Sequence, residues 1–332
     1  MRNVAGGIRA AACCMLALAC VLPASVGAQA TDAGAFPRKA IRFIVPVPPG
    51  GGADFVARTY AKRLGEMLGQ PFVIDNRGGA AGIIAMELTA RAAPDGYTLV
   101  QTNVSTVSIN PFIYRKLPYD ALADFAPVSL STLNPLVLVV HPAVPARSVP
   151  ELVSLARASP GRFGYASLGG GSIQHLAGHL FAKGAGLDLT HVPYKGAAPA
   201  TVDLLAGQVS MAFSGVGTVV GHAKAGRLRA LALTGSERID AFGDIPLMRD
   251  VGPDIPFLLW NGVLAPARTP APVVRMLNAA VVEAAGSAEV RSALASQSTT
   301  PASNTPEAFA RFIRDEQERY RKVVRESGAR AD

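Results

Sequence analysis

Three short segments of the sequence combine glycines with the start of a predicted helix. Residues 48–54 are Pro-Pro-Gly-Gly-Gly-Ala-Asp, residues 167–172 are Ser-Leu-Gly-Gly-Gly-Ser, and residues 194–199 are Tyr-Lys-Gly-Ala-Ala-Pro. The first turn of a helix leaves backbone N–H groups unpaired at the positive end of the helix dipole, and glycine lets a ligand approach them. Three such helix starts, each following a strand, predict an anion-binding site at the carboxyl ends of the strands.

The side chains of these loops indicate which anion they would bind. Lys195 is their only cation, so recognition would depend on backbone amides and hydroxyl groups, which favours a small carboxylate over a highly charged phosphate. Each loop alone could equally be a tight strand-to-helix turn, and it is the set of three that favours a site. The candidate ligand-binding residues are Pro49, Gly50, Gly51, Gly52, Ala53, Asp54, Thr102, Ser105, Ser167, Gly169, Gly170, Gly171, Ser172, His175, Lys195, Gly196, Ala197 and Ala198.

Two residues have both a structural and a functional interpretation. Asp54 lies in the first turn of its predicted helix, where a carboxylate pairs with free amides, but it could also receive an ammonium or hydroxyl group of a ligand. Trp260 is the single tryptophan, and we expect it to pack in the core or at a hinge, with cavity lining as the alternative.

Nucleotide-binding motifs do not fit the spacing of the glycines. A P-loop requires Lys followed by Ser or Thr after its last glycine, whereas Ala53 and Asp54 follow Gly52. A dinucleotide fingerprint requires a third glycine where this chain has Phe55 or Gln174. We therefore expect no nucleotide, and we expect no cofactor of any other kind.

A hydrolase is the first alternative function. Ser167 is one glycine short of a nucleophile elbow, because Tyr165 occupies the first glycine position. His175 follows within the same segment and could act with Ser167 as a base, although a hydrogen-bonded pair of Ser172 and His175 in a first helical turn is the commoner arrangement. We expect no catalytic residues.

A metal-binding receptor is the second alternative. His175 and His179 are four residues apart on a predicted helix and could face one metal ion, with His191 as a third ligand. However, Leu176 stands where a zinc protease would carry its glutamate. We expect no bound metal.

The N-terminus predicts export. Arg2 and Arg9 precede an apolar stretch at 10–22 and a run of small residues, a pattern typical of a cleavable signal peptide. We assign residues 1–28 to this peptide, although cleavage after Ala30 fits equally well, and expect the mature protein in the periplasm.

The mature chain would contain no cysteine and a mild positive charge. All three cysteines lie within the predicted signal peptide, which excludes disulfides and thiolate metal sites from the remainder. Removing a peptide with two arginines and no acids lowers the formal net charge from +8 to +6. The basic residues are scattered singly, which argues against a nucleic-acid partner, while a positive field would assist the capture of anions.

Strand and helix patterns alternate along most of the chain, which favours an α/β fold with doubly wound sheets. The fully apolar residues 136–140 suit the middle of a parallel sheet. Predicted strands lie at 41–45, 72–74, 97–100, 136–140, 163–166, 209–213 and 228–233, and predicted helices at 53–68, 83–93, 149–159, 172–183, 199–205, 271–285 and 306–326.

The helical end of the chain suggests that it returns to the first domain. We place the outward crossing near residues 134–135 and the return near 256–260. Domain 1 would then comprise residues 36–135 plus 256–332, and domain 2 residues 136–255.

Several longer runs resemble one known family. The opening at 37–54 is similar to that of the tripartite tricarboxylate transporter receptors, also called Bug proteins. Further matches, in the family's order, are 75–77, 94–99, 117–120 with 124–125, 191–196 and 228–232. The resemblance extends over nearly the whole mature chain.

The resemblance implies a periplasmic-binding-protein type II fold with two domains, a hinge and a cleft between the domains. It also implies a monomer that binds a dicarboxylate or tricarboxylate, an acidic amino acid or an aromatic acid, and delivers it to the membrane subunits of a tripartite transporter. The family's contacts fall on 50–54, 102–105, 167–172 and 195–198. The chain departs from the family pattern at Gly78, where proline is frequent, and at Ala81, where glycine is common; we do not rely on that loop for binding.

Overall fold

The computed structural model describes residues 36–236 and 238–331, so the predicted signal peptide lies outside the described residues. No helix in these two ranges is both long and apolar enough to cross a membrane. The strands are β1 (Ile41–Val45), β2 (Phe72–Asn76), β3 (Thr98–Asn103), β4 (Phe125–Val140), β5 (Gly164–Ser167), β6 (Thr190–Pro193), β7 (Met211–Gly215), β8 (Arg229–Leu233) and β9 (Leu258–Pro266). The α-helices are α1 (Gly52–Leu68), α2 (Ile83–Ala90), α3 (Asn110–Ile113), α4 (Val149–Ala158), α5 (Ile173–Ala185), α6 (Ala197–Leu205), α7 (Val216–Lys224), α8 (Met248–Val251), α9 (Ala271–Gly286), α10 (Ala288–Ala295) and α11 (Pro306–Ser327). Three short helical turns are η2 (Ala80–Gly82), η3 (Ser105–Ile109) and η4 (Asp240–Phe242).

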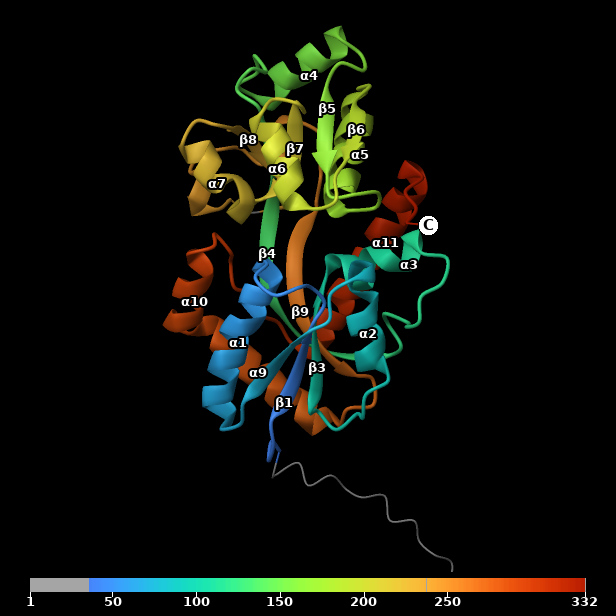
Figure 1. Ribbon diagram of the computed structural model, residues 1–332, viewed down its shortest axis with the longest axis vertical. Coiled ribbons are helices and arrows are strands. Elements are labelled where there is room, and N and C mark those ends of the chain that lie inside the picture. Colours follow the sequence, from blue (N-terminus) through green and yellow to red (C-terminus); the bar gives the residue numbers. More distant parts are fainter. Residues whose placement is uncertain (1–35, 237, 332) are drawn as a thin grey trace, which may run out of the picture. The chain divides into compact units, whose positions relative to one another are not determined.

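The strands form a mixed sheet in the order β2-β1-β3-β9-β4-β7-β5-β6, with β8 also paired to β4. Strands β1, β2 and β3 are parallel, as are β5, β6 and β7. The long strand β4 pairs with β9 through Pro135 and then with β7 and β8 from Leu136 onward. We call β1, β2, β3 and β9, with α1 to α3 and α9 to α11, the first lobe (Figure 1). The second lobe consists of β5 to β8 with α4 to α8, and β4 belongs to both lobes.

The prediction that residues 136–140 lie in a parallel sheet is wrong in direction. This part of β4 is antiparallel to both β7 and β8. Leu136, Leu138 and Val140 face one core, whereas Val137 and Val139 face another, and all five are fully buried. The apolar run therefore indicates a central strand that is buried on both faces. It does not indicate whether the neighbouring strands are parallel or antiparallel to it.

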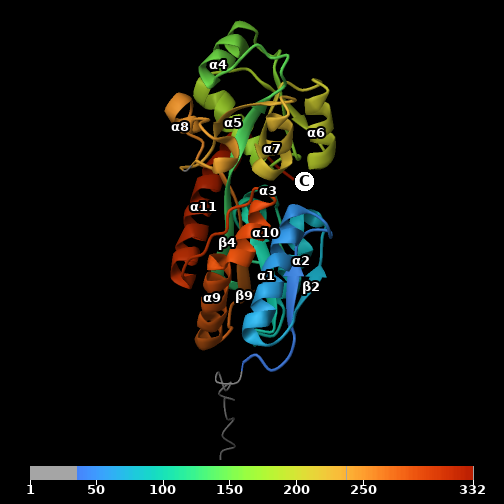
Figure 2. The same cartoon turned by 90° about the vertical axis from the view of Figure 1, so that its left-hand side faces the viewer.

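The C-terminal helices pack mainly against first-lobe elements, and α11 also contacts α5 of the second lobe. Helices α9 and α10 contact α1, and α11 lies alongside α9 and against β4 (Figure 2). As the sequence predicts, α11 begins after Thr305, whose side chain accepts a hydrogen bond from the Ala308 N–H, with Pro306 at the first helical position. This strongly amphipathic helix buries Phe309, Ile313 and Tyr320.

Candidate ligand-binding site

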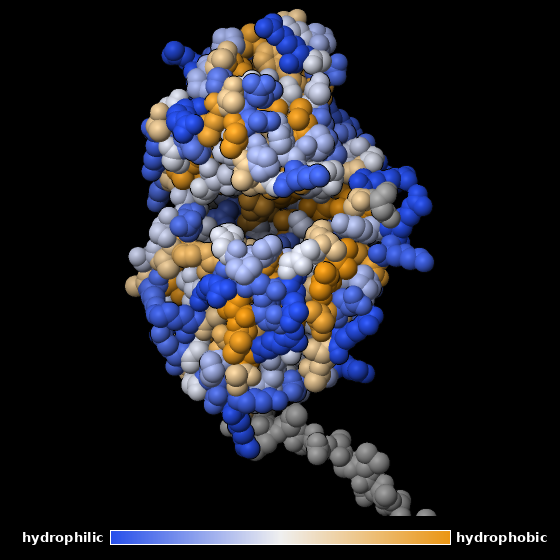
Figure 3. Space-filling view, viewed as in Figure 1, coloured by the Kyte–Doolittle hydropathy of each residue, from blue (hydrophilic) through white to orange (hydrophobic). Residues whose placement is uncertain are grey.

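A cavity of about 880 Å³ is lined by residues of both lobes. The space-filling view shows a hollow in this face of the molecule with apolar colouring at its floor (Figure 3). Its polar boundary consists mainly of helix starts, each of which follows a strand.

The start of α1 contributes Gly52 and Ala53 to this cavity. Gly51 caps the helix in an extended conformation and offers no side chain to the first-turn amides, which face outward at the positive end of the dipole. Neither Gly51 nor Gly52 would bring a Cβ within 4 Å of another group, so the approach to these amides is open.

The Asp54 side chain does not line the cavity. It stabilises the loop through hydrogen bonds. Its side chain is 4% exposed and accepts hydrogen bonds from the Gly50 N–H at 2.9 Å, from Arg58 Nε at 2.9 Å and from Asn76 Nδ2 at 2.8 Å. Burial raises the pKa of Asp54, but these hydrogen bonds together hold it below its ordinary value. The structural interpretation of Asp54 accounts for all of these contacts.

The start of α5 contributes Gly170, Gly171 and Ser172. Ser172 caps the helix by accepting a hydrogen bond from the His175 N–H at 3.2 Å, and its hydroxyl donates to the Gly169 carbonyl at 2.8 Å. The Gly171 N–H donates to His175 Nδ1 at 3.1 Å, so a neutral imidazole fixes the loop from the helix side. Gly171 has a φ of 76°, which favours glycine, and a Cβ there would also press on Ile113 Cδ1 at 2.9 Å.

A third helix start, that of α7, was missed by the sequence reasoning. Gly215, Val216, Gly217 and Thr218 line the cavity, and Gly215 caps α7 without a side-chain hydrogen bond. The signal was available, because residues 213–217 place two glycines directly after a strand, as in the other loops.

Strands β3 and β9 contribute the side-chain amides of Asn103 and Asn261. Asn103 Oδ1 accepts hydrogen bonds from the N–H groups of Ser105 and Thr106 at 3.0 and 3.1 Å, which caps the helical segment that starts there. Asn261 donates to Thr132 Oγ1 at 2.8 Å and accepts from Gln101 Nε2 at 3.2 Å. Asn103, Ser105 and Asn261 line the cavity in fixed orientations.

The remaining wall is largely apolar. Ile109, Ile173 and Leu259 line it, together with Trp260, which is 1% exposed. Trp260 donates from Nε1 to Glu316 Oε2 at 3.0 Å and therefore serves both core packing and cavity lining. Among the described lining residues, Arg330 is the only cation, and none carries a carboxylate.

Six of the sequence-predicted residues meet in this cavity, and the others lie outside its lining. Within the lining are Gly52, Ala53, Ser105, Gly170, Gly171 and Ser172. Outside it are Pro49, Gly50, Gly51, Asp54, Thr102, Ser167, Gly169, His175, Lys195, Gly196, Ala197 and Ala198.

The loop before α6 differs from the other two predicted loops in position. Lys195 to Ala198 span the start of α6, which follows β6, the last strand in the sheet order. Helix α7 instead follows β7, which pairs with the central strand β4. The strand order therefore brings the start of α7, and not that of α6, to the lining of this cavity.

The predicted pairing of Ser167 with His175 is corrected by the structure. Ser167 Oγ lies 2.6 Å from His191 Nε2, and Ser167 is 1% exposed. The His175 ring stacks on that of His191 with centroids 3.9 Å apart, and the Tyr165 ring lies 5.1 Å from His191 and 6.5 Å from His175 in a nearly parallel orientation. Ser167 and these rings form a packed cluster behind the glycine loop, away from the cavity lining.

The three histidines considered as metal ligands do not converge. The His175 and His191 rings are stacked nearly parallel, at an interplanar angle of 12°, and one nitrogen of each is already hydrogen-bonded, His175 Nδ1 to the Gly171 N–H and His191 Nε2 to Ser167 Oγ. Within residues 36–236 and 238–331, no group of three His, Cys, Asp or Glu side chains could hold a metal ion. Burial lowers the pKa of all three histidines, that of His175 to about 4 with a further contribution from His191.

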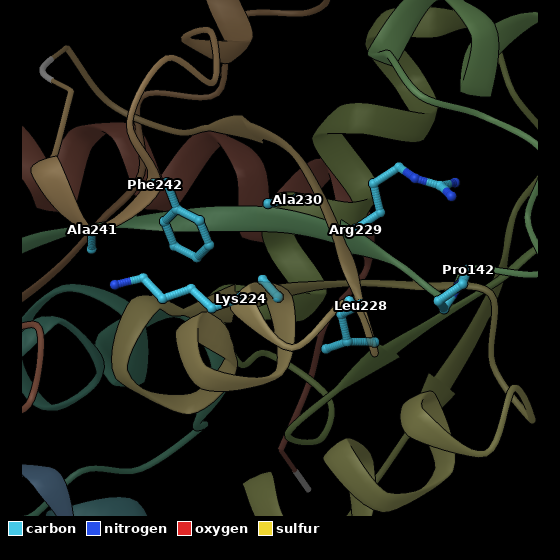
Figure 4. A pocket seen from close by; sticks show the side chains of 9 residues that line it. Pro142, Lys224, Leu228, Arg229, Ala230, Ala241 and Phe242 are labelled. Atoms are coloured by element: carbon cyan, nitrogen blue, oxygen red, sulfur yellow. The ribbon is translucent and has the colours of Figure 1, made fainter.

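A second cavity of about 430 Å³ lies beside β8 within the second lobe. Figure 4 shows Arg229 extending away from Lys224 and Phe242, and the Arg229 guanidinium donates to the carbonyls of Val144 and Ala146. This cavity contains none of the sequence-predicted residues. The larger cavity is therefore the candidate site.

Comparisons with known proteins place the chain among solute receptors. The family model for the tripartite tricarboxylate transporter family receptor matches residues 56–329. Protein BugT of Bordetella pertussis is 38% identical over 319 residues, which cover 95% of this chain and 98% of BugT. An R. palustris protein solved with adipate is 34% identical with a TM-score of 0.79, over 89% of this chain and 99% of that chain. MatC from Rhodopseudomonas palustris, solved with bound malate, is 31% identical with a TM-score of 0.73, over 87% of this chain and 100% of that chain. The predicted two-domain periplasmic-binding-protein fold is confirmed.

Proposed function

This chain belongs to the tripartite tricarboxylate transporter receptor family, and from that premise we propose that it captures a small linear dicarboxylate in the cavity lined by both lobes. The family comprises solute receptors and not enzymes, so the hydrolase alternative is set aside. The observation that carries the proposal is the convergence of three helix starts, those of α1, α5 and α7, on one cavity without a carboxylate side chain in its described lining.

The charge distribution supports a ligand with carboxylates and no ammonium group. Helix starts stabilise negative charge through unpaired N–H groups and the helix dipole. An amino-acid ligand would also bring an ammonium group, for which the described lining offers no counter-ion. Adipate and malate, with which two relatives were solved, each have two carboxylates on a short chain.

The apolar wall supports a hydrocarbon spacer between those carboxylates. Ile109, Ile173 and Leu259 can cover methylene groups, while Asn103 and Asn261 offer amides for hydroxyl or carboxylate oxygens. Burying each methylene would add about 0.8 kcal/mol of favourable free energy. We therefore favour adipate-like ligands over shorter ones.

We further propose closure of two domains, residues 36–135 plus 256–332 and residues 136–255, around the ligand. The change of β4 partners between Pro135 and Leu136 and the start of β9 at Leu258 support a hinge at the two crossings. Small-angle scattering with and without ligand would test it, and an unchanged radius of gyration at saturation would exclude appreciable closure.

The cellular role proposed here follows from family membership. The mature chain would be released into the periplasm by cleavage after Ala28 or Ala30, would bind its ligand as a monomer, and would present it to the membrane subunits of a tripartite transporter. N-terminal sequencing of periplasmic protein checks the first step, and a chain that starts at Met1 would contradict it.

Calorimetry with adipate, malate and citrate tests the binding function, alongside native mass spectrometry of protein purified without unfolding. Gly52→Val should weaken binding at least tenfold, because it adds bulk at the cavity without a clash. Gly221→Val is the matched control, since Gly221 also has open space around its Cβ position but lies in α7 outside the lining. Failure of every carboxylate to bind, with no retained metabolite, would refute the proposal.

A further inference from the structure

The loop that joins β2 to α2 has an unusual backbone. Gly79, Ala80, Ala81 and Gly82 have φ angles of 104°, 45°, 51° and 84°, so four consecutive residues adopt positive φ. This region suits glycine and is disfavoured for residues with a Cβ. In the described part of the chain, only Ser298 shares this property among non-glycine residues, and it too lines the cavity.

Packing explains Gly78 and Gly82, whereas Gly79 has room for a Cβ and is explained by its φ of 104°. A Cβ on Gly82 would lie 2.6 Å from Thr106 Cγ2 and 3.0 Å from Pro46 Cβ. A Cβ on Gly78 would lie 2.7 Å from Pro48 Cδ. The loop is thus wedged between η3 and the segment that follows β1, and its position is fixed.

The two alanines have no such explanation in the fold. Both are exposed, and glycine would adopt their φ angles more readily. The Ala81 carbonyl accepts a hydrogen bond from Asn110 Nδ2 at 3.1 Å. This bond stabilises the backbone conformation of the loop without involving the Ala81 methyl group. Disfavoured backbone conformations concentrate at functional sites, where the surrounding structure maintains them.

The alanines differ in what they face. Ala81 lines the candidate ligand cavity together with Gly79 and Gly82, whereas Ala80 does not. We propose that Ala81 is a specificity-determining residue whose methyl group forms part of the cavity wall and restricts the ligand to an unbranched chain. This inference rests on the proposed function, because it concerns the same cavity and ligand class.

The neighbouring alanines allow a matched experiment. Glycine and asparagine are the residues that best tolerate positive φ, so Ala81→Gly and Ala81→Asn should both fold, as should Ala80→Gly and Ala80→Asn. Each pair makes the same change in nearly the same backbone conformation, and only one member changes the cavity lining. Thermal unfolding would verify that the paired variants have similar Tm values.

The probes are adipate and its 2-methyl and 3-methyl derivatives, measured by calorimetry. Ala81→Asn should weaken adipate binding at least tenfold, whereas Ala80→Asn should stay within twofold of the parent protein. Ala81→Gly should improve the affinity for at least one methyl derivative relative to adipate by threefold or more, and Ala80→Gly should leave that ratio unchanged.

The outcomes separate this inference from the function on which it rests. Equal effects at positions 80 and 81, or an unchanged ratio in Ala81→Gly, would overturn the role of Ala81 while adipate binding by the parent protein upheld the receptor function. If the parent protein bound none of these probes and neither malate nor citrate, both the proposed function and the role of Ala81 would be refuted.

Discussion

The first-lobe loop before α1 and the second-lobe loop before α5 present the same kind of surface but are held by different chemistry. A buried carboxylate, that of Asp54, anchors the first loop through the Gly50 N–H. A neutral imidazole, that of His175, anchors the second through the Gly171 N–H. Two sequences that look alike at their glycines therefore depend on acceptors of different charge, an anionic carboxylate and a neutral imidazole nitrogen, that are protonated in different pH ranges.

The two walls of the site should therefore respond to acid at different pH values. Hydrogen bonds keep Asp54 ionised below its ordinary pKa of 3.8, whereas burial keeps His175 neutral below its ordinary pKa of 6.5. As the pH falls, the histidine side is affected first and the carboxylate side only in stronger acid.

The largest effect should come from Asp54→Ala. Removing the carboxylate takes the acceptor from the Gly50 N–H and Arg58 Nε and leaves Asn76 Nδ2 with the Val47 carbonyl alone, and we expect a loss of about 3 kcal/mol in the free energy of unfolding. Urea unfolding measures this. The control Asp250→Ala, at a 52% exposed side chain beside Arg249, should change stability by less than about 0.5 kcal/mol. Similar losses in both variants would remove the special role of Asp54.

A pH series should give the next effect. The lowered pKa of His175, about 4, means that the unfolded chain binds a proton between pH 6.5 and 4 while the folded chain does not. Stability from this group is complete above pH 6.5 and should fall by up to about 1.4 kcal/mol per pH unit as the pH decreases through that window.

His175→Gln provides the test of that assignment. Glutamine keeps an acceptor for the Gly171 N–H but cannot be protonated in this range. The variant should flatten the decline in stability between pH 6.5 and 4, measured by urea unfolding at each pH. An unchanged profile would assign the decline to His191 or His179 instead.

Ser172→Ala should have a smaller effect of about 1 kcal/mol on unfolding, because it removes a helix cap. The control Ser148→Ala removes the corresponding cap of α4, where Ser148 accepts from the Glu151 N–H. Both should lose similar stability, but only Ser172→Ala should weaken dicarboxylate binding. Equal binding losses would mean that α5 matters to the site only through general stability.

Lys195→Ala should have the smallest effect. Lys195 lies outside the cavity lining, so calorimetry should give a dissociation constant within twofold of the parent value. A loss larger than that of Gly52→Val would show that recognition depends on this cation and would contradict the backbone-amide account.

The sequence alone determined the local features of the site. These features depend only on residues that are close together in the sequence. They are the strand, glycine loop and helix at 41–68 and at 163–183, the Ser172 and Thr305 caps, and the segments that resemble the family. Caps and tight turns are set by the φ preferences and short side chains of consecutive residues, so they can be read before the fold is known.

The tertiary structure decided which local features meet. The strand order brings the start of α7 to the cavity lining instead of that of α6, pairs Ser167 with His191, and makes residues 136–140 antiparallel to their neighbours. It also brings the loop at 78–82, which the sequence reasoning did not rely on, to the cavity wall. These outcomes depend on contacts between residues far apart in the chain, and no local propensity encodes the order in which strands pair.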